Sequence, residues 1–285
     1  MSRTQLQQID QLIGIGFGET DPDTRYMARI MMQAVIPHKE TASREVGVQN
    51  GDFTVGIQAG IGERLPSGSL PRLLLVWVIA EAIRTRSREI YLGGSLAEFM
   101  GKLEIVPHGG RWGSITRLRT QARRLFNARV SFIYNGPKGY GSKNVQFADM
   151  VRMFWTNEDF SQGDLEGHSI TLSQPFYDEI VKRPFPFDMN ILRGLARSPL
   201  GIDLYVWLTY RVSYLKQSVD ISWEQLRKQF GSDYSSPTGG KEFARAAKRE
   251  LTKINAAWPQ LCYETPRGRL RLHPSAPSIG KSKPA

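Results

Sequence analysis

The feature of this sequence that most constrains its fold is an internal repeat. Trp77 and Trp207 lie 130 positions apart, and so do Gly110 and Gly240. Each half shows the same order of local patterns: an apolar helix, a short strand, a helix that begins at a serine, a Gly-Gly turn, a basic helix and a β-hairpin. Two matches in the same order indicate a duplication rather than a chance likeness.

Local signals support this order in both halves. A proline in the first turn marks the start of each apolar helix. The next helix of each half begins with a capping-box pattern, in which Ser95 precedes Glu98 and Ser222 precedes Gln225. We expect the apolar helices and the strands that follow them at residues 70–83, 89–92, 198–210 and 219–221.

The order of elements is that of a winged helix-turn-helix. Asn135-Gly136-Pro137 and Pro266-Arg267-Gly268-Arg269 each separate two strand-like runs and predict the hairpins, or wings. The predicted fold class is α+β, with two winged helix-turn-helix domains arranged as a tandem pseudo-repeat. The expected segments are an N-terminal extension and lead-in over 1–64, an N-terminal winged helix over 65–160, a C-terminal winged helix over 161–275 and a flexible tail over 276–285.

Positive charge is concentrated in the two repeated halves. The chain has 38 Lys and Arg against 27 Asp and Glu, which gives a net charge of +11. By segment, the net charge is −2 over residues 1–70, +9 over 71–145, −3 over 146–200 and +7 over 201–285. A uniformly basic surface would not alternate in this way, and the pattern favours a polyanionic partner, either nucleic acid or an anionic membrane surface.

The third helix of each half has an apolar and a basic face. Apolar side chains recur at the helical spacing over residues 115–126 and 243–254, and six arginines without an acidic residue lie within 109–130. Arginine and lysine on such a helix bond phosphates or reach guanine edges in the major groove of DNA. The candidate DNA-binding residues of the two helices are Arg111, Thr116, Arg117, Thr120, Arg123, Arg124, Lys241, Arg245, Lys248 and Arg249.

The second hairpin supplies further candidates, Arg267, Arg269 and Arg271, whose alternation places all three on one side of a strand. An ordinary solvated surface is the alternative interpretation for the helices and for the hairpin. Exposed helix faces usually mix both signs of charge, which the first helix does not. The second helix contains Glu242 and Glu250, so its signal is weaker, and for the hairpin both interpretations stay open.

Several kinds of chemistry lack their motifs in this sequence. Cys262 is the single cysteine, which excludes a disulfide framework and a multi-thiolate metal site and is typical of a reducing cytosol. No Gly-x-x-x-x-Gly-Lys-[Ser/Thr] motif is present, and the four histidines do not have metal-ligand spacing. We therefore expect a protein without enzymatic activity, catalytic residues, metal or cofactor.

A membrane partner is not expected either. The longest apolar run covers residues 73–80, whereas a spanning helix needs about 20 apolar residues. The first eight residues are polar and lack the apolar stretch of a signal peptide. These patterns favour nucleic acid over a membrane as the polyanion and predict a cytoplasmic location.

Two runs of this sequence carry a family resemblance: Leu65-Pro66-Ser67-Gly68-Ser69-Leu70-Pro71-Arg72-Leu73-Leu74-Leu75-Val76-Trp77-Val78 and Gly109-Gly110-Arg111-Trp112-Gly113-Ser114-Ile115-Thr116-Arg117-Leu118-Arg119. They resemble the plasmid-encoded RepA replication initiators of Gram-negative bacteria. The resemblance covers roughly residues 25–275. It implies a cytoplasmic initiator that binds repeated duplex DNA sequences (iterons) at a plasmid origin, helps to open the duplex, and recruits host replication proteins such as a helicase or an initiator. It also implies that the C-terminal winged helix reads bases, while the N-terminal one contacts the backbone and mediates formation of a homodimer.

Two other functions remain open at this point. A winged-helix transcriptional repressor or autoregulator of a plasmid or mobile element has the same fold and the same charge pattern. A replication enzyme such as a primase or nuclease is a third hypothesis, because acidic residues distant in sequence can meet in a fold. The iteron sequence, the host range, the host protein contacted and the active oligomeric form do not follow from the sequence.

Overall fold

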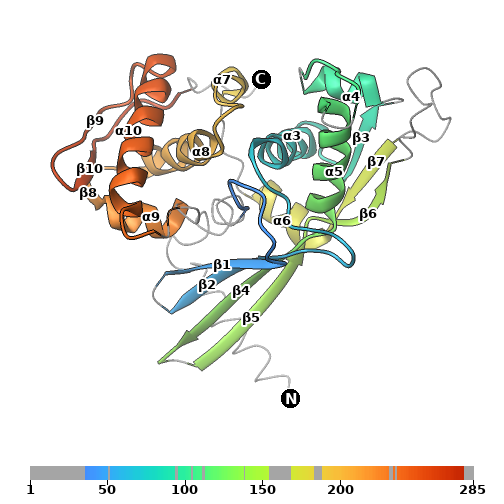
Figure 1. Ribbon diagram of the computed structural model, residues 1–285, viewed down its shortest axis with the longest axis horizontal. Coiled ribbons are helices and arrows are strands. Elements are labelled where there is room, and N and C mark those ends of the chain that lie inside the picture. The colour runs from blue at the N-terminus through green and yellow to red at the C-terminus, as the bar shows by residue number, and fades with distance from the viewer. Residues whose placement is uncertain are drawn as a thin grey trace.

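The protein has two hydrophobic cores, one for each half of the repeat. They are seen in a computed structural model that describes residues 36–50, 52–93, 96–103, 105–110, 113–137, 139–153, 168–182, 188–230, 234 and 236–278. The cores meet along helices α3 (Ser69–Thr85) and α8 (Pro199–Tyr214), which contact each other at the centre of the molecule (Figure 1). Val76 of α3 belongs to the second core, so this helix is buried on both sides.

The first half follows the predicted order of elements. Helix α3 is followed by β3 (Glu89–Gly93), α4 (Leu96–Lys102), α5 (Ser114–Phe126), β4 (Arg129–Gly136) and β5 (Gly139–Gln146). The predicted apolar stripe of α5 is confirmed, because Ile115, Leu118, Ala122, Leu125 and Phe126 are all buried. Ser95 of the predicted capping box lies outside the described residues.

The wing of the first half pairs with the lead-in segment. Strands β1 (Glu45–Asn50) and β2 (Phe53–Gln58) join β4 and β5 in an antiparallel sheet of order β1-β2-β4-β5. Strand β3 instead pairs with β7 (His168–Leu172), which also pairs with β6 (Ala148–Arg152). In the first winged helix, strand β3 and the wing therefore lie in two separate sheets instead of pairing with each other. Helix α6 (Gln174–Lys182) follows β7.

The second half has a three-stranded sheet of the winged-helix type. After α7 (Met189–Gly194) and α8 come β8 (Val219–Ser222), α9 (Trp223–Phe230), α10 (Gly239–Ala257), β9 (Tyr263–Glu264) and β10 (Arg269–Leu272). The strand order is β8-β10-β9, so the strand and the wing pair directly. The predicted capping box is formed: the Ser222 amide donates to Gln225 Oε1 at 2.9 Å, and the Gln225 amide donates to Ser222 Oγ at 3.1 Å.

The Gly-Gly pairs that mark the repeat lie where the third helices begin: Gly109 and Gly110 precede α5, and Gly239 and Gly240 are the first residues of α10. A β-carbon at Gly239 would lie 2.1 Å from the carbonyl oxygen of Tyr234, so no larger residue fits there. Gly110 has a φ of +89°, a conformation that L side chains rarely adopt. Each pair therefore contains one position that requires glycine, the second glycine in the first half and the first glycine in the second half.

The two folded halves extend beyond the expected boundaries. The first core includes Ile170, Phe176 and Ile180, which lie past the expected boundary at residue 160, because α6 packs against α3 and β7 pairs with β3. At the other end, the Trp258 indole donates to the carbonyl oxygen of Ala276 at 3.0 Å, so the first residues of the expected tail lie against the second core. Residues 279–285 of that tail lie outside the described residues.

Candidate nucleic-acid interface

Helix α10 and the wing β9–β10 together form a basic groove. Lys241, Arg245 and Lys248 are exposed on one face of α10, and Arg267 is exposed at the tip of the wing. All four side chains line one open groove with a volume of about 790 Å³, called the wing groove below. The sequence placed these residues 26 positions apart at the extremes, and the fold brings them together. A groove with a helix on one side and a wing on the other presents cations where two elements can contact one duplex.

Packing below α10 fixes the direction of this basic face. Phe243, Ala247 and Leu251 on the opposite side of the helix are completely buried in the second core. The Lys248 ammonium lies 5.7 Å from the centre of the buried Trp223 ring, a cation–π contact that holds the side chain at the groove. Helix rotation is therefore set by the core, and the cations of the wing groove are held on its outer surface.

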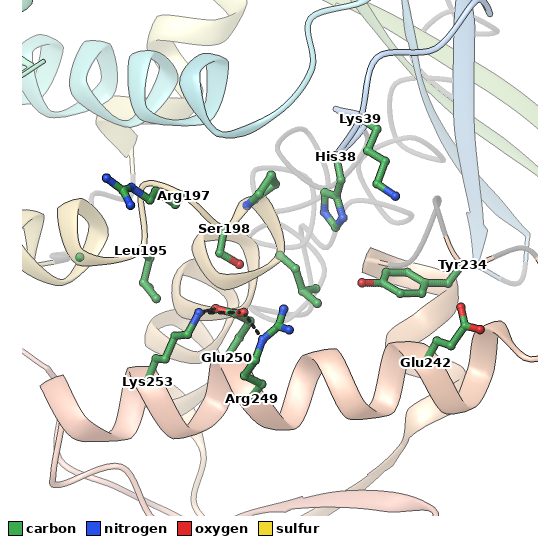
Figure 2. A pocket seen from close by; sticks show the side chains of 13 residues that line it. His38, Lys39, Leu195, Arg197, Ser198, Tyr234, Glu242, Arg249, Glu250 and Lys253 are labelled. Atoms are coloured by element: carbon green, nitrogen blue, oxygen red, sulfur yellow. Dashed lines mark hydrogen bonds and ion pairs between the residues drawn. The ribbon is translucent and has the colours of Figure 1, made fainter.

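Arg249, the fourth candidate on α10, lies outside the wing groove, although it lines a neighbouring pocket together with Arg245. Its Nε lies 3.1 Å from Glu250 Oε1, and the Lys253 ammonium lies 3.1 Å from both oxygens of the same carboxylate (Figure 2). The Glu250 side chain is 1 % exposed. These residues line a cavity of about 370 Å³ between α10, the start of α8 and the lead-in segment, and Arg249 is not among the residues that line the wing groove.

The buried Glu250 carboxylate has a structural role at the start of α8. A β-carbon at Gly201 would lie 3.0 Å from Glu250 Oε2, so the carboxylate packs directly against the first turn of that helix. A negative charge at a helix N-terminus is stabilised by the helix dipole. Glu250 therefore links α10 to α8. Arg249 and Lys253 neutralise its charge and also contribute positive charge to the surface.

Two of the three wing arginines are paired within the sheet. Arg271 Nε lies 2.7 Å from Asp220 Oδ1, and Arg269 Nη1 lies 3.0 Å from Asp220 Oδ2. Hydrogen bonds from Arg271, and to a smaller extent from Arg269, lower the pKa of Asp220 to about 2. The sequence predicted all three on one side of a strand, but only Arg269 and Arg271 lie on β10, where Asp220 of β8 pairs with both, whereas Arg267 lies in the turn before β10 and lines the groove.

The first basic helix, α5, is open at its N-terminal end. Arg117 is exposed and has no hydrogen-bond or ion-pair partner among the described residues. The hydroxyls of the two threonine candidates are already used by the backbone: Thr116 Oγ1 donates to the carbonyl oxygen of Gly110 at 3.0 Å, and Thr120 Oγ1 donates to that of Thr116 at 2.9 Å. Arg111, a further candidate at this end, lies outside the described residues.

The C-terminal end of α5 is covered by carboxylates from the lead-in segment. Arg123 Nε lies 2.6 Å from Glu63 Oε1, and Arg124 Nη2 lies 3.1 Å from Glu40 Oε1. Glu40 also accepts from Arg64 at 3.2 Å. The helix lacks acidic residues of its own, and no local pattern predicts these partners beyond the net negative charge of residues 1–70. Two of the candidate residues on α5 are thus ion-paired.

A buried ion pair joins the two halves of the molecule. Arg72 on α3 and Asp203 on α8 are at most 1 % exposed, and two nitrogens of the guanidinium, Nε and Nη2, lie 2.7 and 2.9 Å from the two carboxylate oxygens. His38 Nε2 donates to the same carboxylate at 2.9 Å. Burial opposes ionisation of Asp203, but the charge of Arg72 and hydrogen bonds from His38 and Arg72 outweigh it and hold its pKa below the usual value.

Within the described residues, no group of three His, Cys, Asp or Glu side chains is placed to hold a metal ion. No helix in the same part of the chain is long and apolar enough to cross a membrane. The positively charged surfaces of α5 and of the wing groove are thus the main candidate sites that the described structure offers.

Comparison with known proteins gives matches in family and in fold. Residues 65–225 match the family model described as plasmid-encoded RepA protein. A crystal structure of domains 2 and 3 of RctB, residues 155–483, superposes with a TM-score of 0.55 at 11% identity and covers 85% of this chain and 94% of that one. Another, of a selenomethionine derivative of the same two domains, has a TM-score of 0.57 at 11% identity and covers 88% and 99%. A search of curated protein sequences found no match.

Proposed function

The chain belongs to the plasmid-encoded RepA family, and on this basis we propose that it initiates plasmid replication by binding repeated duplex DNA sequences at an origin. The observation that carries the proposal is the wing groove, where Lys241, Arg245 and Lys248 of α10 lie beside Arg267 of the wing. A recognition helix in the major groove with a wing on the adjacent backbone requires cations at these two places.

The two winged helices have different roles in this proposal. Arg245 and Lys248 lie on a helix whose position is set by a fully buried stripe, which suits the precise placement that base reading requires. In α5 the exposed cation without a described partner is Arg117, near the N-terminal end of the helix, which suits a limited number of phosphate contacts. We therefore assign base contacts to α10 and backbone contacts to α5.

Binding measurements with matched variants of α10 test this assignment. Arg245→Ala should weaken binding to the origin repeat more than binding to random duplex, by a factor of about 5 to 150, the range for one lost base contact of about 1–3 kcal/mol. Arg249→Ala removes the same charge from the same helix, but from a side chain outside the wing groove. It should have the smaller effect on sequence discrimination.

The outcomes of this experiment are distinct. Equal losses of Arg245→Ala on origin and random DNA would assign Arg245 to phosphates, and equal effects of Arg245→Ala and Arg249→Ala would remove the wing groove as the reading surface. DNase I footprinting on the noncoding DNA of the plasmid that carries the gene identifies the repeat to be used. A flat dependence of duplex affinity on salt would refute DNA binding, since each neutralised phosphate contributes a slope of about −0.9 in log K against log salt.

Initiation, rather than repression alone, is tested in cells. A plasmid that lacks this gene and still replicates would exclude the initiator function and leave autoregulation. As an initiator, the protein would act in the cytoplasm by binding and by recruiting host replication proteins, without a catalytic step. We include a homodimer in the proposal, and gel filtration with and without origin DNA measures it.

A further inference from the structure

The lead-in segment places two carboxylates on the basic face of α5. Glu63 Oε1 lies 2.6 Å from Arg123 Nε, and Glu40 Oε1 lies 3.1 Å from Arg124 Nη2. The arginines are neighbours in the last turn of α5. Arg117, near the first turn, has no partner of this kind among the described residues. The basic face is therefore divided into an open N-terminal end and a neutralised C-terminal end.

Both carboxylates are held by ordered parts of the fold. The Glu63 side chain is 14 % exposed, and the turn before it packs closely on the end of α5, since a β-carbon at Gly60 would lie 2.7 Å from the carbonyl oxygen of Asn127. The segment before Glu40 is fixed by Arg72, which donates to the carbonyl oxygens of Ile36 and Pro37. The two acids are thus delivered to α5 by packed chain.

Glu40 is held in its charged form by the cations around it. Partial burial favours the neutral form of Glu40, but hydrogen bonds and positive charge from Arg124, and then from Arg64, lower the pKa of Glu40 below its usual value. Glu63 lies beside the Arg123 guanidinium at hydrogen-bond distance. A carboxylate binds a guanidinium with the geometry that a phosphate uses, so it competes for the same donors.

We propose that Glu40 and Glu63 limit the DNA contacts of the first winged helix to the N-terminal end of α5 and so reduce binding to unrelated sequences. This inference rests on the proposed DNA-binding function. Phosphate contacts provide essentially all of the affinity for non-specific DNA. Neutralising Arg123 and Arg124 therefore lowers this non-specific affinity and leaves the residues of the wing groove unchanged. Sequence discrimination is the ratio of the two affinities, and it rises when the non-specific term falls.

The test compares Glu40→Gln, Glu63→Gln and the double variant with Glu45→Gln. Glu45 is an exposed acid of the same segment, on β1, without a described ion pair, and its replacement changes net charge as much as each single replacement does and half as much as the double variant. On random duplex, the double variant should bind more tightly, because each new phosphate contact makes the salt slope steeper by about 0.9. The exposed Arg123 supplies one such contact, and a change of about 1.8 is the upper limit, since the Arg124 side chain is only 12 % exposed. Between 50 and 200 mM salt, two contacts add a factor of about 12 to the loss of affinity.

A second pair of variants keeps the test valid if the acid variants unfold. Arg117→Gln should reduce the salt slope on random duplex by about 0.9, whereas Arg123→Gln should leave it unchanged, because its guanidinium is already paired. Equal salt slopes for the double acid variant and Glu45→Gln would overturn the inference. Weaker binding of random duplex by the double variant would also overturn it, because the acids would then position the arginines for phosphate. In both cases, salt-dependent binding by the parent protein leaves the proposed function standing. A parent protein without such binding refutes the proposed function itself.

Discussion

Replacing Asp203 with asparagine tests how the two halves of the protein are held together. The change keeps the size of the side chain and removes its charge, so the guanidinium of Arg72 remains buried without a counter-ion. Arg72 is fully buried, and its bidentate contacts with Asp203 span the boundary between α3 and α8. Breaking one side of a buried ion pair is far more costly than losing an exposed pair.

The magnitude follows from the partners that Arg72 keeps. Removing one member of a buried pair typically costs about 3–5 kcal/mol. In the Asp203→Asn variant, Arg72 still donates to the carbonyl oxygens of Gly68, Pro37 and Ile36. We therefore expect the lower end, about 3 kcal/mol, which is a large share of the roughly 5–15 kcal/mol that stabilises a typical domain.

Urea unfolding followed by circular dichroism and by tryptophan fluorescence measures this loss. In Asp203→Asn, we expect a lower urea midpoint and separation of the two probes, since the contact between the cores is weakened. Asp220→Asn is the control: it removes a carboxylate paired with Arg271 at the surface and should change the midpoint little. The double variant Arg72→Met, Asp203→Asn leaves no unpaired charge, so the two single losses should not add.

The reasoning fails if Asp203→Asn and Asp220→Asn shift the midpoint by the same small amount. It also fails if the losses of Arg72→Met and Asp203→Asn are additive, because the residues would then be independent. Either result would mean that the bidentate contact does not stabilise the boundary between α3 and α8.

Three further predictions follow from other contacts. Because the folded-state pKa of Asp203 lies below its unfolded value, its contribution to stability is complete above the unfolded pKa and is lost as the pH falls through the folded pKa; urea midpoints measured from pH 5 downward should fall less steeply for Asp203→Asn than for the parent. Ser222→Ala removes the cap that accepts from the Gln225 amide and should cost about 1 kcal/mol in urea unfolding, whereas Ser222→Thr should retain most of it. Glu250→Ala leaves Arg249 and Lys253 without their buried partner and should lower the thermal midpoint; an unchanged midpoint would contradict a structural role for the carboxylate.

The repeat in the sequence predicted the order of elements because each local pattern depends on nearby residues. The apolar stripe of α5 lies within one helix, and the cap at Ser222 involves Gln225 in the first turn of the next helix. Strand pairing does not follow from such patterns. In the second half β8 pairs with the wing strand β10. In the first half β3 pairs with β7, some 80 residues later, and the wing strand β4 pairs with β2 of the lead-in segment.

The candidate site was predictable to a similar degree. Helical spacing correctly grouped Lys241, Arg245 and Lys248, because one core-facing stripe fixes the opposite face. Spacing alone did not separate Arg249 from them, since the difference depends on the buried Glu250. The Arg124–Glu40 pair joins residues 84 positions apart, and no local pattern carries that information.

The short segment around His38 has a consequence for changes in chain length. Surface loops usually accept insertions, because lengthening a loop costs little chain entropy. Here His38 is bound to Asp203 in the second half, while Glu40, two residues later, is bound to Arg124 in the first. An inserted residue between them would displace one contact or the other. Insertions and new chain termini should therefore be placed elsewhere, although by secondary structure this stretch is a loop.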